Sequence, residues 1–222
     1  MKKLALTFDD GPYGGHKDAG GNYTNMALQL IKNFNAQMER MGMPRVVVTF
    51  FMQAAYITKN PATFNQVIKD GHEIANHAWI HYQWIPSKNI FMVSEDQAFE
   101  EFQKSHEEFA KYGVKTTQFR PPGGHITESL WARIKQRYPQ YCLAGWDYHP
   151  EKGTAAAFDI NFAHRGPRDA AVYLMHEKKP GTLTKLKEFL VREKLKIQKG
   201  EFRLVSSSEI IRTDYWKGLT IR

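Results

Sequence analysis

The chain has 222 residues and a formal net charge of +8 at pH 7, and its residues are 42% hydrophobic and 24% charged. This length and composition are typical of a globular protein with one well-buried domain. No run approaches the roughly 18 consecutive apolar residues that a membrane-spanning helix needs, so no membrane span is expected. The positive charge favours an anionic partner or surface. The basic residues are dispersed and not interleaved with aromatic residues, however, so nucleic-acid binding is not expected.

Cysteine usage and the N-terminus give little information on the compartment. The single cysteine, Cys142, excludes an internal disulfide and a cysteine-rich zinc site. It lies in the apolar run 141–144, where we expect a buried, inert thiol. Lysines follow Met1 as in a signal peptide, but no apolar segment of adequate length comes next. The location is therefore left open between the cytoplasm and, if a leader was removed, the cell envelope or the exterior. No oligomeric state is predicted.

The first half of the chain alternates strand-like and helix-like segments. The apolar run 4–6 predicts a buried strand. A helix is predicted over 24–41, because apolar residues recur there at spacings of three and four. Residues 46–51 are β-branched or aromatic, as in a strand buried on both faces. Asn60 is the expected cap of a helix that ends near Gly71.

The second half continues the alternation, without a repeat or a linker. Ser94 and Gln97 form a capping-box pattern, and Thr127 can cap a later helix. A further helix is expected around 183–190. Strands are expected at 73–75, 117–119, 141–145, 171–175 and 202–205. Six or seven strands alternating with helices predict an α/β fold, a small (β/α) barrel whose functional groups gather at the strand ends.

Polar residues follow several predicted strands. Asp9 and Asp10 come directly after the first strand, and both carboxylates can reach one site only if the backbone turns there. A metal ion for one carboxylate and an arginine for the other would offset the cost of desolvating them. Alternatively, these residues form an ordinary Asp-Gly-Pro turn.

Histidines supply the second polar signal. His77 and His81 follow the strand at 73–75, and a helical segment would place both on one face, where they could chelate a metal ion. With nine histidines in the chain, a chance pair at this spacing is the competing interpretation. His106 lies on an apolar helix stripe and is expected at the edge of the core, not as a ligand.

Three further segments end predicted strands. Prolines and glycines after Arg120 predict a rigid loop whose backbone N–H groups can face a ligand. Trp146 and Asp147 follow the strand at 141–145. His176 follows the strand at 171–175 and fits either a core position or a catalytic one.

Together these five segments resemble the signature of the polysaccharide deacetylase family, the NodB-like carbohydrate esterases. That signature begins with Thr-Phe-Asp-Asp-Gly-Pro, which stands here at residues 7–12. It continues with His-Ser/Thr-x-x-His, Arg-Pro-Pro-Tyr-Gly, an Asp/Trp segment and Leu-x-His. Each block has a counterpart here in the same order, and supporting stretches extend the resemblance over residues 4–212.

The resemblance implies a single domain over residues 1–222 with a distorted (β/α) barrel of about seven parallel strands. It implies hydrolysis of acetyl groups from sugars, usually N-acetyl groups of glucosamine-containing polymers. Asp10, His77 and His81 would bind one divalent metal ion, most often Zn²⁺, with Co²⁺ or Mn²⁺ as alternatives. Three protein ligands leave a position open for water.

Further roles also come from the resemblance. Asp9 would be the general base, held by Arg120, and His176 would protonate the departing amine. The backbone N–H of Gly123 would help to hold the oxyanion. Asp147 would orient His176. Candidates for substrate contact are Pro122, Gly123, Trp146 and Tyr148.

Several positions depart from the family pattern. Ala78 replaces the usual Ser or Thr, and Gly123 replaces tyrosine, which removes a pocket wall but keeps a backbone donor. The residues after Asp147 differ from the family's Asp-x-x-Asp-Trp segment. The glycine-rich segment around His16 and the loop at 148–168 also differ, and we expect them to shape substrate access.

The leading hypothesis is a metal-dependent deacetylase that acts on an N-acetylated glycan, with peptidoglycan ahead of chitin-like oligomers because of the basic charge. An O-acetyl esterase acting on glycans such as xylan would use the same groups. A non-catalytic glycan-binding relative is the alternative from another class, but it predicts loss of the base or the acid, and both Asp9 and His176 are present.

Overall fold

Seven parallel strands form one curled sheet in the computed structural model, which describes residues 1–15, 21–81, 93–149, 169–179 and 181–221. The strands are β1 (Lys2–Asp9), β2 (Thr49–Met52), β3 (Glu73–Asn76), β4 (Gln118–Phe119), β6 (Cys142–Leu143), β7 (Ala170–Met175) and β8 (Phe202–Leu204). Their order is β6-β4-β3-β2-β1-β7, and β8 pairs with β1. An isolated parallel bridge between Tyr148 and Tyr173 links the segment after β6 to β7. The predicted α/β fold is confirmed as a curled half-barrel, while its extent over residues 1–222 stays a prediction.

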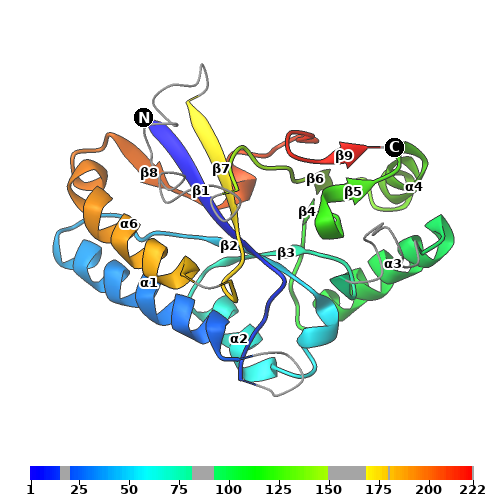
Figure 1. Ribbon diagram of the computed structural model, residues 1–222, viewed down its shortest axis with the longest axis horizontal. Helices are drawn as coiled ribbons and strands as arrows, with labels where there is room; N and C mark the ends of the chain where they lie inside the picture. The colour runs from blue at the N-terminus through cyan, green and yellow to red at the C-terminus, as the bar shows by residue number, and fades with distance from the viewer. Residues whose placement is uncertain (16–20, 82–92, 150–168, 180, 222) are drawn as a thin grey trace.

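Helices lie outside the curl (Figure 1). Those near β1, β2 and β7 are α1 (Tyr23–Arg40), α2 (Pro61–Lys69) and α6 (Thr182–Gln198). Those near β4 and β6 are α3 (Glu95–Lys111) and α4 (Glu128–Arg137). Single-turn helices occur at Ala54–Tyr56 (η1), Pro122–Gly124 (η3) and Ser207–Glu209 (η6). A small parallel pair that the sequence did not predict joins β5 (His125–Ile126) to β9 (Thr220–Ile221). Among the described residues no helix is long and apolar enough to cross a membrane.

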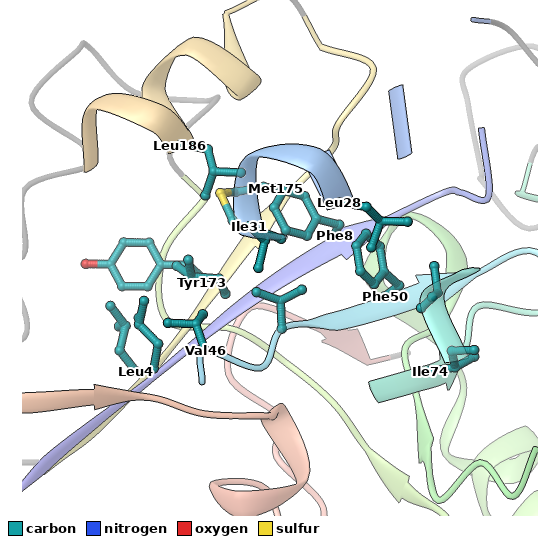
Figure 2. Packing of buried hydrophobic residues seen from close by; sticks show 14 of the residues in the cluster. Leu4, Phe8, Leu28, Ile31, Val46, Phe50, Ile74, Tyr173, Met175 and Leu186 are labelled. Carbon is teal, nitrogen blue, oxygen red and sulfur yellow. The ribbon is translucent and has the colours of Figure 1, made fainter. Parts of the chain in front are cut away.

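Strand β1 separates two environments, because successive side chains point to opposite faces. Leu4, Leu6 and Phe8 belong to the main apolar cluster together with residues of α1 and α6. Leu4 and Phe8 are labelled in Figure 2. Ala5 lies in a smaller cluster inside the curl, and Thr7 binds Arg120 on that face. The alternation therefore sends Asp9 inward, toward the same interior.

Strand β2 begins at Thr49, not at residue 46 as predicted. The reason is topological, since β8 occupies the edge of β1 at Lys2–Leu4 and leaves β2 to pair only from Thr7 onward. The Asn35 side chain instead satisfies the backbone N–H and C=O of Val46, at 2.7 and 3.0 Å. Propensity identified an extended segment, but pairing decided where the strand starts.

Helix caps follow the sequence at two of three positions. The capping box of Ser94 and the cap of Thr127 on the N–H of Leu130 are confirmed. Asn60 makes no side-chain cap hydrogen bond, so that prediction is wrong. Its amide instead donates to the carbonyl oxygen of Pro12 at 3.0 Å and accepts from the N–H of Gly14 at 3.1 Å. Asn60 thus ties α2 to the loop after β1.

Two other side chains bear on the predictions. His106 is partly buried and lies 2.9 Å from the Tyr141 hydroxyl through Nδ1, as expected of an edge-of-core residue. Cys142 is only partly buried, with Sγ 3.6 Å from the carbonyl oxygen of Arg212, so the predicted burial is wrong in degree. The thiol lies on β6, at one end of the strand order.

Buried His72 makes stability depend on pH. It is 8% exposed, packs on Phe50, and burial lowers its pKa from 6.5 to about 4. The unfolded chain therefore binds more protons between these values, so the folded state loses stability as the pH falls from about 6.5 to about 4. The expected loss is on the order of 3 kcal/mol in the free energy of unfolding. Urea unfolding of wild type and His72→Gln across this range measures it. An unchanged slope in the variant would contradict the assignment.

Candidate metal and catalytic site

A cavity of about 460 Å³ opens at the carboxyl ends of the central strands. Seven of the residues predicted for function line it, and Arg120 lies directly behind it; they come from the ends of β1, β3, β4, β6 and β7. The lining residues are Asp9, Asp10, His77, His81, Gly123, Gly124, Trp146, His149, Leu174, His176, Lys178 and Lys179. The parallel sheet thus gathers segments that are far apart in sequence, as predicted for this architecture.

A turn in the backbone brings both carboxylates to this cavity. Asp9 faces inward as the last residue of β1, and a continuing strand would send Asp10 to the opposite face. Instead Asp10 has φ of +84°, a left-handed conformation that is uncommon for residues other than glycine. Its N–H still donates to Phe51 O at 3.1 Å, so the turn starts while the strand pairing persists. The backbone turn that the sequence required for both carboxylates to reach one site is therefore present.

Arg120 is fully buried behind Asp9. One guanidinium nitrogen donates to Asp9 Oδ1 at 2.6 Å and to the hydroxyl of Thr7 at 2.8 Å. The other nitrogens donate to the carbonyl oxygens of Ala144 and Gly145. A buried guanidinium with this many acceptors is well satisfied, and it fixes the orientation of the Asp9 carboxylate. The remaining oxygen, Oδ2, lies 4.0 Å from His77 Nε2.

His77 and His81 converge although no helix connects them. The sequence interpretation had placed both on one face of a helical segment. The chain leaves β3 at Asn76 and turns at Ala78, which has φ of +62°. The Asn76 side chain accepts a hydrogen bond from the N–H of Ala78 at 2.8 Å, which supports this turn. The two imidazole rings lie 5.3 Å apart. A local hydrogen bond in the loop, and not helical periodicity, therefore brings the two imidazole rings together.

The donor atoms fit a divalent metal ion. Asp10, His77 and His81 each offer a ligand atom, and these atoms lie within 4.8 Å of one another. His77 Nδ1 lies 2.7 Å from the carbonyl oxygen of Arg120, which favours the tautomer with its lone pair on Nε2. Nε2 is buried and has no hydrogen-bond partner among the described residues, as a nitrogen reserved for a metal would be. Two imidazoles and one carboxylate are a common zinc ligand set.

Electrostatics hold Asp10 and His81 in the protonation states that metal binding needs. Burial alone would raise the pKa of Asp10, but the nearby His77, His81 and Lys178 hold it well below its usual range. Burial, together with His77, lowers the pKa of His81 to about 4, so the ring is neutral at pH 7. An ionised carboxylate and a neutral imidazole are the forms that coordinate metals.

Gly123 and Trp146, two of the candidates for substrate contact, lie in the cavity wall. The N–H of Gly123 donates a hydrogen bond to His81 Nε2 at 3.2 Å, and Gly123 itself has φ of +65°. The Trp146 ring occupies a slot in which a Cβ on Gly124 or Gly218 would approach within 2.6 or 2.7 Å. Small residues on both sides therefore fix the indole plane.

Besides Arg120, three of the predicted residues are not among the described residues that line the cavity. The Asp147 carboxylate accepts hydrogen bonds from Tyr215 Oη and Lys217 Nζ, both at 2.7 Å, and from Val172 N at 2.9 Å. Both its oxygens accept hydrogen bonds from these groups, and the predicted orientation of His176 by Asp147 stays a prediction.

Tyr148 packs on Tyr173, with ring centroids 4.9 Å apart, and is not among the described lining residues. Pro122 is buried within η3 and shapes the loop without lining the cavity. The ring next to His176 is that of His149, 5.4 Å away. The segment around His16 and the loop beyond residue 149 lie outside the described residues.

Sequence reasoning missed several supporting residues. Gln53 donates to the carbonyl oxygen of Asp10 at 3.0 Å and accepts from the N–H of His81 at 2.6 Å, so it joins two ligand segments. Lys178 lies 3.0 Å from Asp10 Oδ2. Glu177 is buried beside them. Gln53 follows β2 directly, so its place at a strand end was an available signal, as it was for the predicted residues.

Comparisons with known proteins identify the family of the chain. The family model described as polysaccharide deacetylase matches residues 1–138, and the chain belongs to this family. A peptidoglycan-N-acetylglucosamine deacetylase from Bacillus cereus is 26% identical over 216 residues, which cover 95% of this chain and 89% of that protein. A second, PgdA from Listeria monocytogenes, is 27% identical over 202 residues. That match covers 90% of this chain but 37% of the relative.

A solved structure supports the fold. The peptidoglycan deacetylase PdaC from Bacillus subtilis superimposes with a TM-score of 0.69 at 23% identity, covering 95% of this chain and 90% of that chain. At this identity the likeness concerns the fold alone.

The buried ion pair yields a stability prediction. Arg120→Met leaves Asp9 buried without its partner, and removal of one member of such a pair costs about 3–5 kcal/mol in the free energy of unfolding. Arg133→Met is the control, since its pair with Asp96 is exposed and is worth about 0–1 kcal/mol. Denaturant unfolding compares them. The double variant Asp9→Asn/Arg120→Met should recover part of the loss, and equal losses in the two single variants would contradict the interpretation.

Proposed function

We propose that this protein is a metal-dependent deacetylase that removes N-acetyl groups from an amino-sugar glycan. The observation that carries the proposal is that two adjacent carboxylates have different partners. Asp9 is held by Arg120 through one oxygen, while Asp10 lies with two histidines in a potential metal site. His176 lines the same cavity. Family membership supports deacetylation of a polysaccharide, and the relatives' names point to peptidoglycan.

The metal would be held by Asp10 Oδ1 and by Nε2 of His77 and His81, because the carboxylate oxygen lies 3.5 and 3.7 Å from these nitrogens. We favour Zn²⁺, and Co²⁺ or Mn²⁺ can also use such ligands. A bound ion would acidify a water and polarise the acetyl carbonyl.

The chain's own groups would move the protons. Asp9 would take the proton of the attacking water through Oδ2, since Oδ1 is engaged by Arg120. His176, at the end of β7, would give a proton to the departing amine. Arg120 acts through Asp9, as a positioning residue, by fixing the carboxylate plane.

The wall of the cavity would bind the acetylated sugar. The N–H of Gly123 donates to His81 Nε2. With a metal ion bound to that nitrogen, the N–H would be free to donate to the developing oxyanion. Trp146 offers a fixed aromatic face for a sugar ring. Lys178 and Lys179 add positive charge at the rim, which suits an acidic cell-wall glycan better than a neutral chitin-like oligomer.

Acetate release by the zinc-loaded protein tests the mechanism. Asp9→Asn and His176→Ala should each lower kcat by about 10²–10⁴, the usual contribution of a general base or acid, with metal content unchanged. Asp10→Asn should lose both metal and activity. His106→Gln is the control, because this histidine lies on α3 and binds Tyr141. Full activity of Asp9→Asn would overturn the mechanism.

The substrate is tested with a matched panel of peptidoglycan, chitin oligomers and acetyl-xylan. We expect acetate from N-acetylated glycans, with peptidoglycan turned over fastest. Release from acetyl-xylan alone would indicate the O-acetyl esterase. Binding of a glycan without acetate release from any substrate would indicate a non-catalytic relative and overturn the proposal.

A further inference from the structure

Glu177 is a fully buried acid that the proposed chemistry does not use. It follows His176 directly and is 1% exposed. Its Oε1 accepts a hydrogen bond from the hydroxyl of Thr24 at 2.7 Å, and its Oε2 has no partner among the described residues. Burial raises its pKa to about 7. A buried carboxyl group is costly and calls for a physical reason, and its hydrogen bond with Thr24 indicates one.

Thr24 links Glu177 to the loop that follows Asp10. The Tyr13 N–H donates to the Thr24 hydroxyl at 2.7 Å, and the Thr24 N–H donates to the Tyr13 carbonyl oxygen at 3.1 Å. This reciprocal pair fastens the loop to the first turn of α1. A hydroxyl carries only one proton, so giving it to Glu177 leaves its lone pairs to accept from Tyr13. Without Glu177 the hydroxyl could rotate and weaken that contact.

The loop sets the conformation of a metal ligand. Asp10 adopts φ of +84°, which a residue other than glycine keeps only when its surroundings impose it. Contacts of Gly11 and Pro12 with Gln53 and Asn60 hold one side of the loop. Glu177 and Thr24 hold the other side of the loop. The contact is close, because a Cβ on Gly11 would lie 2.7 Å from Glu177 Oε1.

We propose that Glu177 is a positioning residue for metal binding, which acts through Thr24 on the loop that orients Asp10. The inference rests on the proposed metal site. It assigns to Glu177 no contact with metal or substrate. Glutamine at this position would keep the acceptor and the volume, whereas alanine would remove both.

Zinc affinity of the full chain, measured by competition with a chelator, tests this role. We expect Glu177→Ala to weaken the Kd for Zn²⁺ about 10-fold, the lower end for groups that orient metal ligands, and Glu177→Gln to stay within about 2-fold. Thr24→Val keeps the side-chain shape and should show the same loss as Glu177→Ala. Both substitutions break the same relay of hydrogen bonds, which runs from Glu177 through Thr24 to the loop after β1. The double variant should therefore bind zinc no more weakly than the single variant that has the lower zinc affinity.

Glu193→Ala is the matched control for burial. Glu193 is also 1% exposed but lies on α6 and pairs with Lys196 at 3.0 Å. It should lower Tm without changing zinc affinity. If Glu177→Ala behaves in the same way, Glu177 is merely structural and the inference is overturned. If Glu177→Ala does not fold, Thr24→Val decides, and an unchanged zinc affinity overturns the relay. A wild-type protein that binds no zinc overturns the proposed metal site itself.

Discussion

The buried ion pair between Arg120 and Asp9 is the constraint on which the site depends. Inside the curl there is no bulk water to solvate a guanidinium, so Arg120 takes its acceptors from Thr7, from Asp9 and from the chain after β6. These acceptors come from β1 and from the chain after β6, while Arg120 itself follows β4, so the ion pair also fixes the relative positions of these strands. The same contact leaves one Asp9 oxygen directed at the cavity. Stability of the interior and orientation of the candidate base thus arise from one interaction.

Strained backbone at two positions completes the site. Asp10 and Ala78 are the described residues other than glycine with positive φ, and each lies where a strand gives way to a loop that carries a ligand. Side chains impose these conformations. Gln53 and the relay from Glu177 act around Asp10, and Asn76 acts at Ala78. Strain held by neighbouring hydrogen bonds is common at functional sites, because it presets a geometry that an isolated loop would not adopt.

Much of the architecture could be predicted from local sequence. Apolar alternation and β-branched runs gave all seven strands of the main sheet, since burial on the two faces of β1 dictates its pattern. Caps at Ser94 and Thr127 are local interactions and were identified correctly. Asn60 and residues 46–48 were not, because the loop after β1 uses the Asn60 side chain and β8 occupies the edge that β2 would need.

The sequence by itself determined the residue types of the candidate site, because Asp9, Asp10, His77, His81, Arg120 and His176 each end or follow a recognisable strand. Only the tertiary structure decided which groups meet. It turned Asp147 toward Lys217 and Tyr215, placed His149 beside His176, and gathered Gln53 and Glu177 around the loop after β1. The physical reason is the sequence separation over which the interactions act. Periodicity and capping act within a few residues, whereas these contacts join segments that only the curled sheet brings together.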